Sequence, residues 1–193
     1  MTTLQAELPH RKIWTREEFA RLSDLFPGQR YELIEGDLID KMGQKPPHAY
    51  LITLLNAIFS QRFPGLVRVQ LPIALPEPEG LTSEPEPDLV VLHQNKSGTE
   101  FLRRHPGPQD IALLIEVADS SFQFDRETKG RLYARSGVEQ YWIVDVSQRR
   151  VLVLQGPGDE YKSATIFEGD EKLSFGTFAV TVGDLLAEIP MNY

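Results

Sequence analysis

The sequence predicts a mixed α/β fold (α+β) in which a β-sheet is flanked by helices. Continuous apolar runs over residues 88–92, 111–117 and 141–145 are typical of strands buried on both faces. Apolar residues at helical spacing lie between and before these runs. The chain has 193 residues, of which 41% are hydrophobic, so it can bury a sizeable core without disulfides. We therefore expect a single domain over residues 1–193, with an N-terminal extension over residues 1–14.

Local signals predict the elements of the first half. Thr15 and Glu18 have the spacing of a capping box, which indicates the start of a helix. Pro46-Pro47 suits the first turn of another helix, and Pro72 indicates that an alternating strand lies at a sheet edge or ends early. We expect a helix, a hairpin, a second helix and a half-exposed strand over residues 17–25, 31–39, 48–62 and 66–75.

The second half is punctuated by glycine and by polar connections. Residues 100–104 form at most one helical turn, and Gly137 suits the C-terminal cap of a helix. Tyr141 and Trp142 are expected in the core. The remaining elements are a helix, three strands and a short closing helix over residues 124–136, 151–155, 160–167, 177–182 and 182–189.

Bulk charge and composition limit the classes of function. The net charge of −8 argues against a general nucleic-acid binder, but it is compatible with an enzyme whose clustered carboxylates hold a divalent ion. The absence of cysteine excludes disulfides and cysteine-based zinc sites. The N-terminus lacks the apolar run of a signal peptide, and no stretch is long enough to span a bilayer. We expect a cytoplasmic protein with no membrane partner.

Asp88 and Glu116 are acids in places where acids are normally costly. Asp88 opens one apolar strand, and Glu116 lies near the end of another. A buried, unpaired carboxylate costs several kcal/mol, so it needs a cation or a proton nearby. If both strand ends meet, the two acids share a proton or hold a hard cation such as Mg²⁺. Alternatively, each acid caps its strand and faces solvent.

A helix follows Glu116 and offers a cation. Asp125, Lys129 and Tyr133 are spaced four apart, so they share one helical face. Lys129 on the inner face would reach the carboxylate pair and orient a water molecule or a phosphate. The alternative is a surface Asp–Lys pair, with Tyr133 covering the core. Taken alone, Glu32 is expected to face outward from its hairpin and His48 to be structural.

Several enzyme classes are excluded because their motifs are missing. The sequence has no glycine-rich phosphate loop with its lysine, no Gly-x-Ser-x-Gly elbow and no His-Glu-x-x-His zinc motif.

The acidic positions carry a family resemblance. Pro87-Asp88 followed by Ile115-Glu116-Val117 resembles the signature of the restriction-endonuclease-like nucleases, the PD-(D/E)XK superfamily. Residues 116–145, together with residues 31–36 and His48, look like the Uma family of bacterial restriction endonucleases. Ala118 departs from the broad signature, which has lysine there; Lys129 matches the place to which this family moves that lysine.

The resemblance implies a restriction-endonuclease-like fold and a metal-dependent endonuclease acting on DNA. Asp88, Glu116 and a backbone carbonyl near Val117 would bind Mg²⁺ or Mn²⁺. Glu32 and Lys129 would complete the catalytic group. The residues implied to contact substrate are His48, Asp125 and Tyr133. A homodimer or higher homo-oligomer is expected.

Two other functions remain open. A catalytically inactive family member would bind nucleic acid or protein, or act in assembly, and the acidic charge favours this reading. A glycosidase with two carboxylates would need neither metal nor lysine, so metal dependence would separate it from a nuclease.

Overall fold

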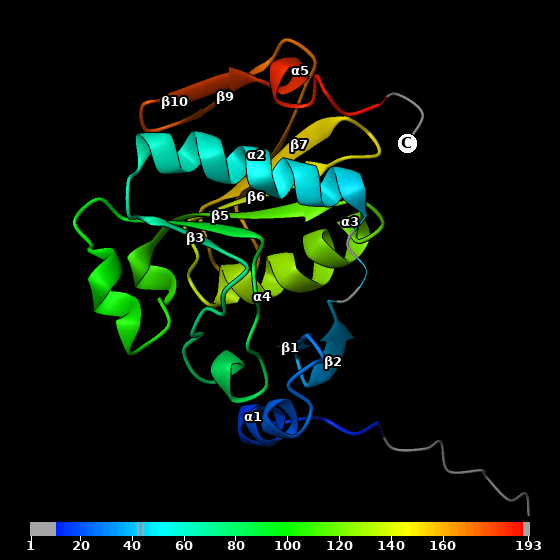
Figure 1. Ribbon diagram of the computed structural model, residues 1–193, viewed down its shortest axis with the longest axis vertical. Coiled ribbons are helices and arrows are strands. Elements are labelled where there is room, and N and C mark those ends of the chain that lie inside the picture. Colours follow the sequence, from blue (N-terminus) through cyan, green and yellow to red (C-terminus); the bar gives the residue numbers. More distant parts are fainter. Residues whose placement is uncertain (1–10, 42, 44, 191–193) are drawn as a thin grey trace, which may run out of the picture.

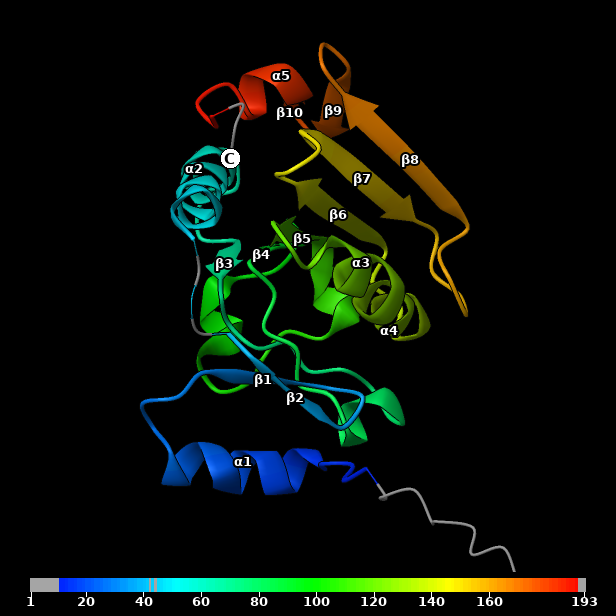
Figure 2. The ribbon, with the colours of Figure 1, turned by 90° about the vertical axis from the view of Figure 1, so that its right-hand side faces the viewer.

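The structure is a computed structural model that describes residues 11–41, 43 and 45–190. Its centre is a six-stranded sheet in the order β3-β4-β5-β6-β7-β8 (Figures 1 and 2). β5 and β6 are parallel, and the other neighbours are antiparallel. The strands are β3 (Val67–Val69), β4 (Leu89–Leu92), β5 (Ile111–Ala118), β6 (Gln140–Asp145), β7 (Arg150–Gln155) and β8 (Ser163–Glu168). The predicted mixed sheet with flanking helices is confirmed.

Helices cover both faces of this sheet, as Figure 2 shows. α2 (Pro46–Arg62) covers one face, where Phe59 and Trp142 belong to one hydrophobic cluster. The segment α3 (Phe122–Phe124), η4 (Asp125–Lys129) and α4 (Gly130–Arg135) covers the other, where Tyr133 and Tyr141 belong to a second cluster. This segment also connects the parallel strands β5 and β6. The predicted core positions of Tyr141 and Trp142 are confirmed, since both are buried.

The N-terminal elements lie at one end of the molecule (Figure 1). α1 (Arg16–Leu25) begins with the predicted capping box of Thr15 and Glu18. β1 (Tyr31–Ile34) and β2 (Asp37–Asp40) form the predicted hairpin. A single β-bridge between Leu33 and Glu84 joins this hairpin to the loop before β4. The hairpin is thereby held beside the strand that begins after Asp88.

Several boundaries differ from the prediction. The expected strand over residues 66–75 ends as β3 at Val69, because Gln70 has a positive φ of 49° and the chain leaves the sheet there. Ile73 and Leu75 instead fill the core from a loop. The prediction missed β9 (Lys172–Phe175), which pairs with β10 (Phe178–Thr181). The closing helix is only α5 (Val182–Leu185), and Ile189 is buried beyond its end.

The short elements complete the chain: η1 (Glu79–Leu81), η2 (Gly98–Leu102) and η3 (Pro108–Asp110). η2 corresponds to the helical turn expected near residue 100. Of the expected N-terminal extension, residues 1–10 lie outside the described residues. Beyond them, Trp14 donates its N–H to the carbonyl of Gly36 at 2.9 Å. Across the described ranges, none of the helices has the length and apolar character required to cross a membrane.

Candidate active site

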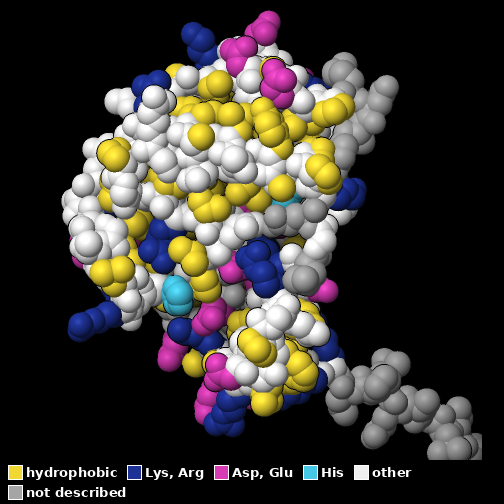
Figure 3. Space-filling view, viewed as in Figure 1, with side chains coloured by type: hydrophobic (Ala, Val, Ile, Leu, Met, Phe, Trp, Pro, Cys, Tyr) yellow, Lys and Arg dark blue, Asp and Glu magenta, His cyan; other side chains and the backbone are white. Residues whose placement is uncertain are grey.

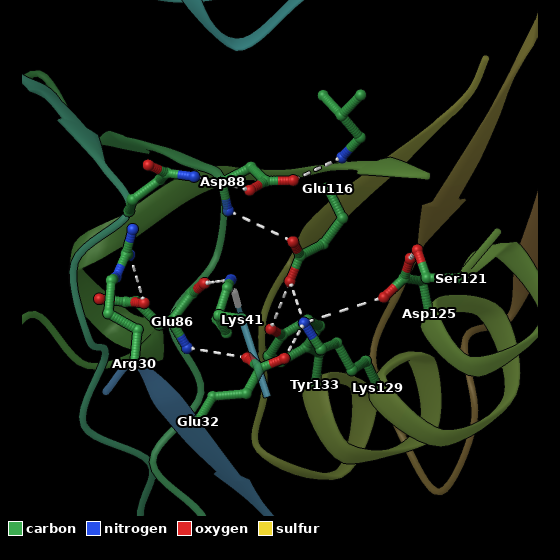
Figure 4. A network of polar contacts seen from close by, with 12 residues as sticks. Arg30, Glu32, Lys41, Glu86, Asp88, Glu116, Ser121, Asp125, Lys129 and Tyr133 are labelled. Atoms are coloured by element: carbon green, nitrogen blue, oxygen red, sulfur yellow. Dashed lines mark hydrogen bonds and ion pairs between the residues drawn. The ribbon is translucent and has the colours of Figure 1, made fainter. Parts of the chain in front are cut away.

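A polar cavity of about 230 Å³ opens between the β1–β2 hairpin, the start of α2, the end of β5 and the α3–η4 segment. Six carboxyl groups and three lysines are among its lining side chains. Glu32, Asp88, Glu116 and Lys129 meet there, although they come from four separate segments (Figure 4). The strand pairing explains part of this convergence, because Leu89 of β4 lies opposite Ile115 of β5.

Asp88 and Glu116 are adjacent and linked through the backbone. The backbone N–H of Asp88 donates to Oε2 of Glu116 at 3.3 Å, and that of Val117 donates to Oδ2 of Asp88 at 2.9 Å. Both side chains are buried, with residue exposures of 3%. The two strand ends therefore lie together, as expected, and neither Asp88 nor Glu116 is a solvent-facing cap.

Lys129 joins the carboxylates from the opposite side. Its Nζ lies 2.8 Å from Oε1 of Glu32, 2.8 Å from Oε1 of Glu116 and 3.8 Å from Oδ1 of Asp125. The hydroxyl of Tyr133 donates to the same Oε1 of Glu116 at 3.1 Å. The alternative of a surface Asp–Lys pair is thus wrong for this structure, since Lys129 and Asp125 are both buried.

A π-helical turn, η4, produces this arrangement. It runs from Asp125 to Lys129 within a segment that is otherwise α-helical. Such single π-turns often mark functional sites, because they shift the helical register locally. Here Lys129 closes the turn, and Tyr133 lies one turn further on. The sequence predicts the shared face of these residues but gives no signal for the wider turn.

Burial dominates the electrostatics of Glu116. It raises the pKa of Glu116 to about 8; Lys129 opposes the rise, and the neighbouring Asp88 adds to it. For Lys129, burial acts to lower the pKa, but the carboxylates of Glu116, Glu32 and Asp125 hold it well above its usual value. Lys129 is therefore charged at neutral pH, and Glu116 is an acid whose ionised form needs an additional cation.

Asp88 has a different environment. Burial opposes its ionisation, but His48, Lys41 and the N–H of Val117 bring its pKa down to about 2. Nε2 of His48 lies 3.2 Å from Oδ2 of Asp88. Asp88 is accordingly ionised beside Glu116, whose pKa is raised. His48 therefore contacts a carboxylate of the site, whereas the sequence taken alone predicts a purely structural histidine.

Glu32 and Asp125 support the centre from two directions. The outward orientation expected for Glu32 from its hairpin alone is wrong, because its side chain is buried against Lys129. Oε2 of Glu32 also accepts the N–H of Glu86 at 3.1 Å. Asp125 accepts a hydrogen bond from Oγ of Ser121 at 2.6 Å. Both acids are thereby fixed by bonds outside the Asp88–Glu116 pair.

Two residues near the site were not found from the sequence. Lys41 lines the cavity and donates to the carbonyl of Glu86 at 2.6 Å. Gln70, with its positive φ, bonds Asp88 through its backbone N–H at 3.2 Å and reaches Oδ1 of Asp88 with its amide at 3.5 Å. No motif indicates either residue, because each acts through the course of a loop.

The donor set fits a hard divalent ion. Mg²⁺ usually binds one or two carboxylates and keeps several waters, and the excess of acids in the cavity favours a cation. The pair of Asp88 and Glu116 offers such ligands. Within the described ranges, no three or more histidine, aspartate or glutamate side chains are grouped to hold a metal by themselves. An ion here would therefore be completed by backbone, water or substrate oxygens.

The mixed sheet, the Asp88–Glu116 pair and the lysine beside it define the restriction-endonuclease-like class. The sequence profile of the Uma2 family, described as "Putative restriction endonuclease", matches residues 16–183, and the chain belongs to this family. The fold is similar to a crystal structure from Anabaena variabilis described as "a putative nuclease belonging to DUF820", with a TM-score of 0.64 and 17% identity over 90% of this chain and 98% of that one. No curated protein matches the sequence significantly.

Proposed function

We propose that this protein is a metal-dependent endonuclease that hydrolyses phosphodiester bonds in DNA. The observation that carries the proposal is the buried group of Asp88, Glu116 and Lys129 at one cavity. Family membership supports a hydrolase acting on nucleic acid. The metal, Mg²⁺ or Mn²⁺, and the choice of DNA are parts of the proposal that follow from the family resemblance and from the donor chemistry.

Asp88 and Glu116 are proposed to hold the ion, together with a backbone carbonyl near Val117. When bound, such an ion makes a water molecule more acidic and offsets charge that develops on the phosphate. Its presence would also favour the ionised form of Glu116, which burial otherwise disfavours. The N–H of Val117 fixes Asp88, so the acid is oriented before any ligand arrives.

Lys129 is proposed to act on the attacking water or on a phosphate oxygen. An ammonium group has three donors. Two of them are directed to Glu32 and Glu116 at 2.8 Å, whereas Asp125 at 3.8 Å is beyond hydrogen-bond distance. One donor is therefore left for the reacting group. Glu32 contributes by holding Lys129 in this position.

His48, Asp125 and Tyr133 were expected to contact substrate, and the structure supports different proposals for them. Tyr133 is fully buried and bonds Glu116, so we propose that it positions this carboxyl group. His48 bonds Asp88, retains some exposure and lines the cavity, so it can meet substrate at the entrance. Asp125 also lines the cavity, but it is held by Ser121.

The distribution of basic side chains on the surface is relevant to how the protein would bind a nucleic acid and assemble. On the face shown in Figure 3, lysine and arginine side chains are scattered rather than gathered into a stripe. A single copy therefore offers no extended basic track on this face. We propose a homodimer or higher homo-oligomer in the cytoplasm, in which two copies present their basic residues to one nucleic acid.

The alternative is a catalytically inactive member that binds or assembles. The network favours it in one respect, since both oxygens of Glu116 already accept hydrogen bonds from the protein. The discriminating experiment is cleavage of supercoiled plasmid and single-stranded DNA with Mg²⁺ or Mn²⁺, using Glu116→Gln as the control. Metal-dependent cleavage that is lost in the variant supports the nuclease. Binding without cleavage by the wild type supports the alternative.

A further inference from the structure

A second cavity, of about 600 Å³, lies away from the catalytic group, beside η2. Its lining includes Arg16, Arg103, Arg104 and His105 around Phe101. Among the described residues, no acidic side chain lines it. In a chain with a net charge of −8, such a concentration of cationic side chains indicates an anionic ligand.

The acids near this cavity are already bonded. Asp110 lies 2.7 Å from Arg104 and 2.9 Å from Lys96, and Glu100 accepts the N–H of Ser97 at 2.8 Å. Arg16 uses its Nε for Glu84, which leaves its two terminal nitrogens available. These ion pairs fix the guanidinium groups without filling all their donors.

Arg103 differs from the arginines that ion pairs or hydrogen bonds hold in place. It is exposed and forms no ion pair within the described ranges. Among the described residues, Arg62 and Arg126 also lack an ion pair, but neither lines this cavity. By contrast, Arg131 is paired with Glu160, and Arg135 is paired with Glu35 and Glu79. Arg149 donates to the carbonyls of Leu186 and Ile189. Of the three arginines that line this cavity, Arg16 and Arg104 are paired, so Arg103 is the one with its full donor set free for a ligand.

Two buried polar atoms close to this cavity lack a partner. Nδ1 of His105 and Nε of Arg68 are buried, and neither has a hydrogen-bond partner in the part of the chain that the structure describes. The guanidinium groups of Arg68 and Arg104 both approach the ring of Phe101, at 5.9 Å and 4.6 Å from its centroid. Two cations on one aromatic ring repel each other, so an anion between them would be stabilising.

This basic region lies on the same face of the sheet as the catalytic carboxylates. Arg68 of β3 lies opposite Val90 of β4, and Asp88 precedes Val90 by two residues. Because side chains alternate along a strand, Arg68 and Asp88 point to the same face, and two residues span roughly 7 Å. A nucleic acid strand that leaves the catalytic cavity on this side of the sheet would approach Arg68 and, across the ring of Phe101, Arg104.

We propose that Arg68, Arg103, Arg104 and His105 form a site for a backbone phosphate of the substrate strand, beyond the bond that is cut. Guanidinium groups bind phosphate oxygens in a bidentate manner, and imidazole adds a further donor. The assignment of this phosphate to a nucleic acid rests on the proposed function. The inference that the cavity binds an anion does not depend on the proposed function.

The test is metal-free binding of a fluorescent 20-nucleotide single-stranded DNA, measured by anisotropy over a range of salt concentrations. The double variant Arg103→Ala/His105→Ala is compared with Arg131→Ala, a matched loss of an exposed arginine on another element. The double variant is expected to bind roughly tenfold more weakly, and the slope of log K against log salt to fall by about one. Arg131→Ala should bind as the wild type does.

A parallel titration with inorganic phosphate distinguishes the source of the ligand. Equal affinity of the double variant and the wild type for DNA would overturn the proposal, as would a site that takes free phosphate while DNA binding is unchanged. If the wild type binds DNA through these residues yet never cleaves it with any metal, the phosphate site stands and the proposed nuclease activity fails. If the wild type cleaves DNA but the double variant binds DNA equally well, the proposed nuclease activity stands and the phosphate site fails.

Discussion

The carboxyl group of Glu116 lies within an apolar strand, and burial raises its pKa to about 8. Replacing this carboxyl group with an amide distinguishes a catalytic role of Glu116 from a structural one. We expect Glu116→Gln to abolish cleavage while leaving the melting temperature of the metal-free protein unchanged or higher, because a buried acid is replaced by a neutral group of the same shape. Lys129 keeps Glu32 as its partner. A sharp fall in melting temperature would instead assign Glu116 to the structure.

Asp88→Asn is the companion variant, and its stability should respond differently. Asp88 is ionised and is stabilised by His48 and by the N–H of Val117. We expect cleavage to be lost and the free energy of unfolding at pH 7 to fall by about 2 kcal/mol, because a pKa lowered to about 2 means that the folded state stabilises a carboxylate that the neutral amide cannot replace. Chemical denaturation and a plasmid cleavage assay measure the two effects. Retained cleavage would remove Asp88 from the mechanism.

Lys129 compensates several buried acids at once. Replacing it with methionine should destabilise the fold by about 3–5 kcal/mol, the usual cost of leaving buried charge unpaired. The exposed Lys162→Met is the matched control and should have little effect. Adding Glu32→Gln to Lys129→Met should restore part of the loss, since one orphaned carboxylate disappears. Denaturant melts check this, and no restoration would contradict the pairing seen here.

The sequence identifies Asp88, Glu116 and Lys129, because acids within apolar strands and a lysine at helical spacing can be recognised from the order of residues alone. It does not reveal that Glu32 is buried: a hairpin with one polar face looks the same whether that face meets solvent or a cavity. The contacts of Gln70 and Lys41 with the site could not be predicted for a related reason. Their contacts depend on loop paths that no local pattern encodes.

At the scale of elements, the helix after β5 combines a π-turn with a glycine in its interior. A methyl group at Gly130 would meet the carbonyl oxygen of Asp125 at 3.5 Å and Cδ1 of Leu154 at 3.8 Å, which are ordinary contacts. Gly130→Ala should therefore stabilise the protein by about 0.5–1 kcal/mol through helix propensity. Gly36→Ala provides the contrast: its φ is +82° and its methyl group would overlap the side chain of Ile13, so the substitution should destabilise the protein. Thermal melts of both variants decide.

The loop between η2 and η3 depends on one buried acid. Burial opposes ionisation of Asp110, but Arg104, Lys96 and the N–H of Gly107 hold its pKa below the ordinary value of 3.8. A lowered pKa gives stability that is present above about pH 4 and is lost as the pH falls further. Asp110→Asn should therefore cost on the order of 2 kcal/mol at pH 7, and the difference from wild type should shrink below pH 4. The exposed Asp159→Asn should show neither effect.

Elements were predictable where the local pattern agreed with the tertiary structure. The buried strands over residues 111–118 and 140–145 appear as apolar runs, and the capping box marks α1. The strand expected over residues 66–75 fails because alternation continues after Gln70 has turned the chain out of the sheet. β9 is missed because a four-residue strand with one buried residue leaves little signal.

At the scale of the whole molecule, the net charge of −8 and the nuclease fold point in opposite directions. The two cavities differ in charge, because six carboxyl groups line the first, whereas the second is lined by three arginines and, among the described residues, by no acid. A divalent ion would reverse the charge balance of the acidic cavity. The proposed nuclease activity therefore depends on whether that cavity binds a metal ion.

Calorimetric titration of the purified protein with Mn²⁺ and Mg²⁺, beside the double variant Asp88→Asn/Glu116→Gln, tests this most directly. We expect the wild type to bind the ion and the double variant, with the same fold by circular dichroism, to show no heat of binding. Absence of binding to the wild type, or equal binding to both proteins, would contradict the proposed metal site and favour a role in binding or assembly.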